Sequence, residues 1–263
     1  MKFSVKSIIS ACTAVLIASV AGSASATDLK VGGIGIVKPT YEGSDAYEVV
    51  GAPFAYPVFS SAGTSIGTFS FNGADDVRIR VLNQNGFEAG VLGGYAFGRD
   101  EDDGLLLRGL GDVDSGFIVG GYLGYRISGL LLDVSYHHIV SGDNTGGYFR
   151  IGASNKYQVT DRFSAKVRVG ATYADGDYMD DYFGITAAQS AASVASLSTY
   201  STSAGFKDVH ANLSGTLDLT NRWALIGGVG YKRLVGDAAD SPIVESEDQF
   251  SATLGMTYRF SLD

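Results

Sequence analysis

The sequence predicts an all-β protein, a transmembrane antiparallel up-and-down β-barrel of about 12 strands with one long external loop that carries a short helix. Three observations predict this fold: the alternation of the last strand, the lengths of the other strands, and the pattern of short and long connections. The composition agrees, because 36 Gly, 15 Tyr and 14 Phe with only 4 Pro suit a closed sheet whose ladders Pro would interrupt.

The last strand, residues 249–260, alternates strictly between apolar and polar side chains. Successive side chains of an extended chain point to opposite faces, so one face of this strand is apolar and the other is polar. The apolar face carries Phe250, Leu254, Tyr258 and Phe260, with an aromatic residue at each end. Transmembrane barrels show this pattern, because apolar residues face lipid and aromatic girdles lie at the two interfaces. We therefore interpret this segment as the barrel-closing strand.

The first residues are expected to be a secretory signal peptide, residues 1–26, which leaves residues 27–263 as the barrel. Lys2 and Lys6 precede an apolar run over 7–21, and Ala24-Ser25-Ala26 is a small-x-small cleavage site. The run is too short to be a membrane anchor, and most of it follows Cys12, which argues against lipidation there. Because Cys12 is the only cysteine, we expect neither a disulfide nor a thiolate metal site after cleavage.

The strands that follow are identified by alternation and turn residues. Most reach the ~9–11 residues that cross a bilayer when tilted. Their predicted bounds are 28–38, 46–59, 64–71, 75–82, 87–98, 115–127, 130–140, 147–159, 162–173, 207–219, 222–234 and 248–260. A charge in mid-strand costs roughly 2–4 kcal/mol against lipid and little in a wet lumen. Six strand charges are therefore predicted to point inward: Arg78, Arg80, Lys166, Arg168, Asp208 and Arg259.

The connections alternate between short turns and longer loops, as barrels of the outer membrane do. The short turns are predicted to be periplasmic, at 60–63, 83–86, 128–129, 160–161 and 220–221, and an even strand count then places both termini in the periplasm. The external loops are 39–45, 99–114, 141–146, 174–206 and 235–247. Within the longest, Thr186 and Gln189 form a capping box that predicts a helix over 187–195. The Ser/Thr tract 196–203 after it is expected to be flexible.

Five segments in and around the loops carry a resemblance to a known family. In chain order they are Pro39-Thr-Tyr-Glu-Gly-Ser-Asp45, Tyr95-Ala-Phe-Gly-Arg-Asp-Glu-Asp-Asp103, Leu107-Arg-Gly-Leu-Gly-Asp112, 178–190 and 234–244. They resemble the MltA-interacting protein / OmpV family of outer-membrane proteins. The resemblance implies a barrel, and in one member a scaffold that holds a murein lytic transglycosylase beside a peptidoglycan synthase; other members are surface antigens or adhesins. Ser261-Leu262-Asp263 extends past the aromatic residue that normally ends such barrels.

Acidic residues gather in two predicted external loops. The candidate residues are Asp100, Glu101, Asp102, Asp103, Asp180 and Asp181. Carboxylates in such numbers could bind a hard cation, but their spacing fits no calcium loop. We favour the interpretation that these are hydrated external loops, which contact divalent ions at the lipopolysaccharide surface.

No catalytic, metal or cofactor site is predicted. His137 and Ser141 share a strand face but lie four residues apart, which is roughly 13 Å along an extended strand and too far for a nucleophile and its base. The adjacent His137 and His138 point to opposite faces, which argues against a metal site with Asp133. The formal net charge of −9 argues against nucleic acid as a partner.

The leading functional hypothesis is a non-enzymatic outer-membrane barrel that serves as a scaffold in cell-wall growth. Its partners would be outer-membrane lipid, lipopolysaccharide, and a periplasmic murein hydrolase and synthase. The alternatives are a narrow diffusion channel, because many inward residues are small or polar, and a surface adhesin or antigen.

Overall fold

The computed structural model describes residues 3–4, 26–59, 68–142 and 146–262. The predicted signal peptide therefore lies outside the described residues, except for Phe3, Ser4 and Ala26, and its boundary stays a prediction. Among the described residues, no helix has both the length and the apolar character needed to cross a membrane.

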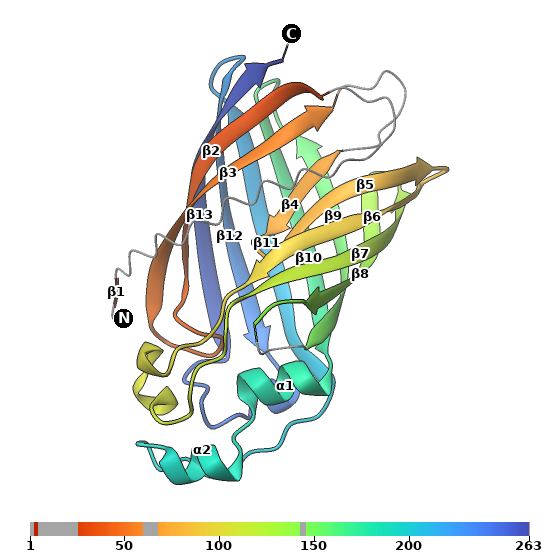
Figure 1. Ribbon diagram of the computed structural model, residues 1–263. Coiled ribbons are helices and arrows are strands. Elements are labelled where there is room, and N and C mark those ends of the chain that lie inside the picture. The colour runs from red at the N-terminus through yellow and green to blue at the C-terminus, as the bar shows by residue number, and fades with distance from the viewer. Residues whose placement is uncertain (1–2, 5–25, 60–67, 143–145, 263) are drawn as a thin grey trace.

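Twelve antiparallel strands form one curled sheet, which confirms the predicted fold class (Figure 1). Its order is β3-β2-β13-β12-β11-β10-β9-β8-β7-β6-β5-β4, and the two-residue β1 (Phe3–Ser4) pairs in parallel on the outside of β3. The strands are β2 (Ala26–Pro39), β3 (Tyr47–Phe59), β4 (Phe69–Gly73), β5 (Asp76–Gln84), β6 (Phe87–Ala96), β7 (Gly116–Ile127), β8 (Leu130–Ile139), β9 (Gly147–Gln158), β10 (Phe163–Ala174), β11 (Gly205–Asp218), β12 (Trp223–Leu234) and β13 (Asp248–Ser261).

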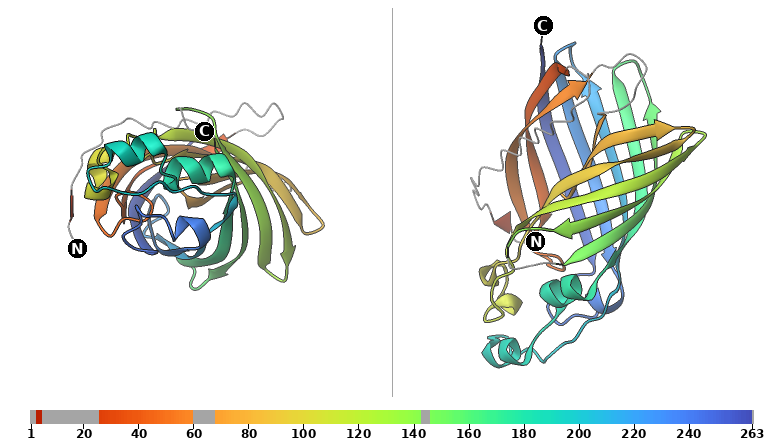
Figure 2. Two further views of the ribbon diagram at one scale, coloured as in Figure 1. Left: turned by 90° about the horizontal axis from the view of Figure 1, so that it is seen from below. Right: turned by 45° about the vertical axis from the view of Figure 1, so that its right-hand side comes forward.

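The sheet is a half-barrel with β3 and β4 at its two ends (Figure 2). These end strands approach each other at Tyr56 and Phe69, whose ring centroids lie 5.6 Å apart. The sequence predicted the other strands to within a few residues. This includes β5, predicted at 75–82. The strand predicted at 64–71 corresponds to β4, which lies later, and part of that prediction falls in 60–67, outside the described residues.

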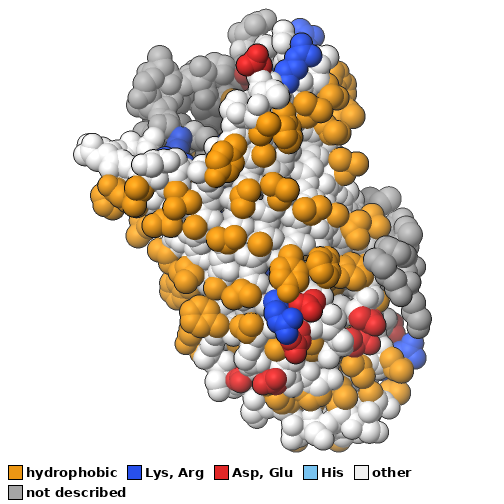
Figure 3. Space-filling model, turned by 180° about the vertical axis from the view of Figure 1, so that it is seen from behind, with side chains coloured by type: hydrophobic (Ala, Val, Ile, Leu, Met, Phe, Trp, Pro, Cys, Tyr) orange, Lys and Arg blue, Asp and Glu red, His pale blue; other side chains and the backbone are white. Residues whose placement is uncertain are grey.

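The walls of the half-barrel have an apolar outer face and a polar inner face. In β13, Phe250 and Leu254 are 56% and 62% exposed, whereas Thr257 on the other face is only 4% exposed. Figure 3 shows hydrophobic side chains spread over the middle of the wall and acidic ones nearer the end that carries the helices. A soluble sandwich would bury its aliphatic face, so this arrangement indicates that lipid covers the outside.

The two ends of the sheet differ in their connections. At the hairpin end the turns are tight, and Asn85-Gly86 and Ser128-Gly129 all have positive φ, as two-residue hairpin turns require. At the other end, the loop end, lie α1 (Gly176–Phe183), α2 (Ala187–Ala192), η1 (Glu101–Asp103), η2 (Leu105–Leu107) and η3 (Gly236–Ala238). α2 confirms the predicted helix, three residues shorter, whereas α1 was not predicted.

The loops pack into a lid, which we define as residues 97–115, 175–204 and 235–247. Met179 and Phe183 of α1 are fully buried in a cluster that includes Leu92, Ile118 and Leu234 from β6, β7 and β12. A second cluster joins Tyr41, Leu107, Leu110, Ile185 and Ile243. The lid therefore has a hydrophobic core of its own, continuous with the loop-end rim of the sheet.

The Ser/Thr tract of the lid is held in place, contrary to the expectation of flexibility. Tyr200 forms a bridge with Ile185 and donates its hydroxyl to the Asp237 carbonyl at 2.8 Å. Thr202 donates its hydroxyl to Asp180 at 2.6 Å. Composition predicted a loose linker, but these hydrogen bonds tie the tract to both neighbouring segments.

Candidate functional site: a luminal charge network and its lid

The inner face of the sheet carries ion pairs that cross from one strand to another. Arg78 of β5 donates to Asp76 at 2.7 Å and to Asp133 of β8 at 2.8 Å. Asp133 also accepts from Arg168 of β10 at 2.6 Å. All four side chains are nearly inaccessible to solvent. One carboxylate therefore joins strands that are not neighbours in the sheet, and the space between them is filled.

A second part of this network lies nearer the loop end. Asp75, in the β4–β5 turn, accepts from Arg150 of β9 at 2.8 Å and from the Tyr148 hydroxyl at 2.9 Å. Its carbonyl oxygen lies 3.2 Å from His137 Nδ1. We call Asp75, Asp76, Arg78, Asp133, Arg150 and Arg168 the luminal network. It couples the short β4–β5 hairpin to β8, β9 and β10.

The six charges predicted to point inward have different surroundings. Arg78, Arg168 and Asp208 are buried as expected. Lys166 is half-buried and donates to the Asn72 amide oxygen of β4 at 2.5 Å. Arg80, also half-buried, lies 3.5 Å from Glu88. The sixth, Arg259, lies at the hairpin-end rim 3.9 Å from Asp28, with its side chain 45% exposed.

A β-bulge in β11 adds one inward charge that alternation does not predict. The register between β10 and β11 shifts at Thr172/Tyr173, where Asp208 pairs with Thr172 and Phe206 pairs with Tyr173. As a result Lys207 and Asp208 are both buried, at 2% and 0% exposed, whereas Phe206 is 51% exposed. Extra residues of this kind bend a strand and re-aim a side chain. Here the side chain re-aimed is Lys207.

Lys207 and Lys232 converge on Glu42, which belongs to the β2–β3 loop. Glu42 Oε1 accepts from Lys207 Nζ at 2.5 Å and from Lys232 Nζ at 2.8 Å, and Oε2 accepts from the Tyr178 hydroxyl at 3.1 Å. We call these four residues the Glu42 junction. Burial alone would raise the pKa of Glu42, but the two lysines outweigh it and lower that pKa to about 2. Glu42 is therefore ionised at any physiological pH.

The α1 helix positions Tyr178 over this junction. Asp175 caps the helix, because its carboxylate accepts from the Tyr178 backbone N–H at 2.9 Å, and its other oxygen accepts from Gly147 N at 2.8 Å. Burial raises the pKa of Tyr178 well above its usual value, so the hydroxyl stays a donor. The Lys207 ammonium also lies 5.1 Å from the Tyr178 ring centroid.

Three of the predicted acidic loop residues, Glu101, Asp103 and Asp180, accept hydrogen bonds within the lid. Asp103 accepts from the backbone N–H of Asp100 at 2.9 Å, which caps η1, and Glu101 accepts from Gly109 N at 3.1 Å. Asp180 accepts from Thr202, as above. Asp102 is exposed, and burial together with neighbouring carboxylates raises the pKa of Asp181. Among the described residues, no three acidic, His or Cys side chains are placed to hold a metal ion.

The structure does not bring together His137 and Ser141, the two residues considered as a catalytic pair. Ser141 accepts from the Phe117 backbone N–H at 2.7 Å. His137 Nε2 instead lies 2.9 Å from Ser135 Oγ, a pair that sequence reasoning missed although i, i+2 residues share a strand face. Ser135 and His137 are 1% and 0% exposed. A nucleophile so enclosed has no room for a substrate in this conformation.

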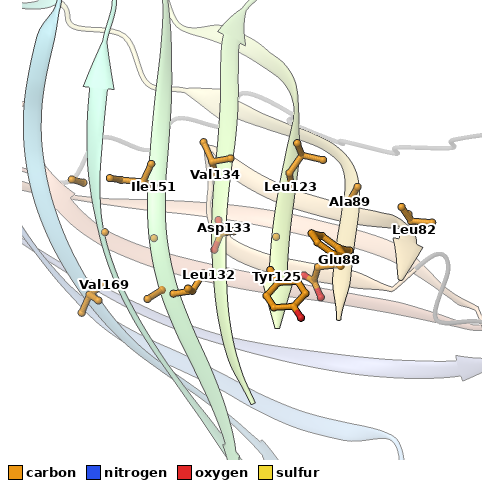
Figure 4. A pocket seen from close by; sticks show the side chains of 16 residues that line it. Leu82, Glu88, Ala89, Leu123, Tyr125, Leu132, Asp133, Val134, Ile151 and Val169 are labelled. Carbon is orange, nitrogen blue, oxygen red and sulfur yellow. The ribbon is translucent and has the colours of Figure 1, made fainter. Parts of the chain in front are cut away.

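An apolar hollow of about 970 Å³ lies on the outer face of the wall (Figure 4). Leu123, Val134 and Ile151 project into it, and each is at least 39% exposed. Asp133 lies behind the strands there and is paired on the inner side. The hollow is therefore part of the apolar wall, and Glu88 and Asp133 are the charged residues among those that line it.

The comparisons with known proteins agree with this architecture. A family model described as MltA-interacting protein MipA matches residues 31–260. The protein YiaT of Escherichia coli K12, provisionally described as an outer-membrane protein, is 26% identical over 119 residues, which are 45% of this chain and 47% of YiaT. The alignment thus spans about half the length of this curated relative.

Solved outer-membrane proteins are similar to this chain at low sequence identity and low TM-score. An outer-membrane channel of Pseudomonas putida F1 is 10% identical with a TM-score of 0.40, covering 89% of this chain and 95% of the channel. The outer-membrane channel DcaP of Acinetobacter baumannii is 9% identical with a TM-score of 0.38, covering 89% of this chain and 96% of DcaP. Neither similarity bears on what this chain does.

Proposed function

The chain belongs to the MltA-interacting protein MipA family, and from that premise we propose that it is a non-enzymatic barrel with an occluded lumen that docks murein enzymes at the outer membrane. It is an outer-membrane β-barrel protein. The finer role rests on one observation: the luminal network and the lid fill the barrel interior at its loop end. A filled lumen supports a role in binding over a role in passing solutes.

The hairpin end is the surface that we assign to the periplasm. Short periplasmic turns and longer external loops are the rule in such barrels. At this end, the exposed cations of the described chain outnumber the exposed carboxylates Asp161 and Asp218; they are Arg126, Lys156, Arg162, Arg222 and Arg259. The loop end is acidic instead. A basic rim favours an acidic surface on a periplasmic partner and accelerates encounter with it.

The partner class follows from the family description, which names interaction with MltA. We propose a murein lytic transglycosylase, with a peptidoglycan synthase as its companion. A capture experiment with the detergent-solubilised barrel and the two purified enzymes tests this. Arg162→Glu with Arg222→Glu should reduce capture several-fold, whereas Arg108→Glu, an exposed lid residue at the opposite end, should leave capture unchanged. Equal capture by all variants would remove the hairpin rim from the proposal.

The channel alternative has its own readout. Single-channel recordings in planar bilayers should show no steady conductance for the wild-type chain, because ion pairs occupy the lumen. Asp133→Ala with Arg168→Ala removes two of the crossing side chains, and brief openings are expected for this variant. Steady ohmic steps from the wild-type chain would favour a channel over a scaffold.

A further inference from the structure

The Glu42 junction has the composition of an anion-binding site. Three donors from the barrel wall and α1 surround one carboxylate: the ammonium groups of Lys207 and Lys232 and the hydroxyl of Tyr178. Charge-assisted bonds of this type are the strong ones in carboxylate and phosphate recognition. The carboxylate they surround comes from a different element, the loop of residues 40–46.

The donor set is built into the wall. Lys207 faces inward only because of the bulge at Thr172/Tyr173, and bulges recur beside functional sites for this purpose. Lys232 lies on the adjacent strand, where Gln249 is its partner on β13 and His210 its partner on β11. The two ammonium groups thus meet at a place that regular alternation would leave with one cation.

The charges around Glu42 are balanced by a single anion. Asp208 lies near the lysines, with Oδ2 3.1 Å from Lys207 Nζ. The charge of Asp75 also acts on Lys232, but Asp75 is neutralised by Arg150 at 2.8 Å. The Oδ1 atom of Asp208 contacts strand residues instead, because it accepts a hydrogen bond from the Thr172 hydroxyl at 3.0 Å and lies 2.9 Å from His210 Nδ1. With Glu42 set aside, two positive charges face the single negative charge of Asp208. A monoanionic group restores neutrality, and Glu42 supplies it.

The site is not sealed on all sides. The Lys232 side chain is 36% exposed and that of Glu42 is 14% exposed, whereas that of Lys207 is 3% exposed. A ligand therefore reaches Lys232 first. The Glu42 loop has separate anchors, because Gly43 N donates to the Gln249 side chain at 3.2 Å and Tyr41 donates to the Ile243 carbonyl at 3.0 Å. The Glu42 side chain can leave without unfolding its loop.

We propose that Lys207, Lys232 and Tyr178 form a binding site for a carboxylate or phosphate group of a small solute or headgroup, and that Glu42 occupies this site as an internal substitute. An external anion competes with Glu42 for the same donors. The site is independent of the docking role proposed above, because it uses the loop end of the barrel and none of the hairpin rim.

Binding of acetate and of inorganic phosphate to the full chain in lipid nanodiscs, measured by calorimetry at constant ionic strength, tests the proposal. Glu42→Ala opens the site, and we expect acetate to bind at least ten-fold more tightly to this variant than to the wild type. Glu42→Gln keeps the shape without the charge and covers the case in which the alanine variant does not fold. Lys232→Met added to either variant should abolish the gain.

The matched control is Glu247→Ala, which also removes a carboxylate paired with a cation, Arg233, at 2.6 Å on the loop-end surface. It should bind acetate no better than the wild type. If neither Glu42 variant gains affinity, or if the gain survives Lys232→Met, the junction is only a structural ion pair and the proposal is wrong. Failure of this test leaves partner capture unaffected, and loss of capture leaves this test unaffected.

Discussion

Leu254→Arg distinguishes a lipid-covered outer wall from one that faces water. Leu254 is the seventh of the 14 residues of β13, is 62% exposed, and pairs with Gly227 and Gly35, so its neighbours offer little cover. In water, substitution of such an exposed residue changes stability by at most about 0.5 kcal/mol. Near the middle of a bilayer, the same arginine costs roughly 2–4 kcal/mol. That range lowers the folded-to-unfolded ratio by about thirty-fold to several hundred-fold.

The assay is urea-dependent unfolding in phospholipid vesicles, followed by the heat-sensitive migration of the folded barrel on gels. Leu262→Arg is the matched control, because Leu262 is also exposed but lies just beyond the end of β13, where an arginine costs about 0–1 kcal/mol. We expect Leu254→Arg to lower the unfolding free energy strongly and Leu262→Arg to lower it only slightly. Equal small losses at both positions would show that lipid does not cover this face.

Three further predictions concern the inside of the barrel. Asp133→Ala leaves Arg168 buried without its carboxylate and leaves Arg78 paired with Asp76 alone. We therefore expect a loss of about 3–5 kcal/mol in unfolding free energy, partly recovered by adding Arg168→Met. Glu42 has a folded-state pKa of about 2 against its ordinary 4.5, so its contribution is complete above pH 4.5 and is lost as pH falls toward 2. That pKa difference corresponds to a contribution of about 3 kcal/mol to the unfolding free energy. The wild type should lose this contribution over that pH range, whereas Glu42→Gln lacks it and has none to lose. Asp175→Ala removes the α1 cap, and limited proteolysis should then cut the lid faster, consistent with a cost of about 1 kcal/mol.

The fold could be predicted from sequence because the bilayer imposes a two-residue period on almost every strand. Phe250 and Leu254 are exposed where alternation placed them. Connection lengths also carry information, since the long loops gather at one end (Figure 1), and the tight β4–β5 turn is the exception among the described connections. The bounds of β4 were predicted less well than those of β5, because a few residues of alternation fit several registers equally well.

The Glu42 junction could not be predicted in the same way. Alternation puts Lys207 on the face of Val209, which is 45% exposed; only the bulge turns Lys207 inward, and no local signal in the sequence marks it. Glu42 lies in a loop whose path depends on contacts with distant residues. The α1 helix, by contrast, left a readable signal, because Asp175 is a good N-cap and Gly184 follows the last helical residue.

The buried charges explain why the barrel interior is specific as well as stable. Replacing a buried ion pair with well-packed apolar residues is often neutral or stabilising, so stability alone does not account for a charged interior. The Asp133 carboxylate requires Arg78 and Arg168 at fixed positions on different strands, and a shift of one residue in register would turn either arginine toward lipid. The luminal network therefore fixes the register of β5, β8 and β10, and the same side chains that set the register also occupy the lumen.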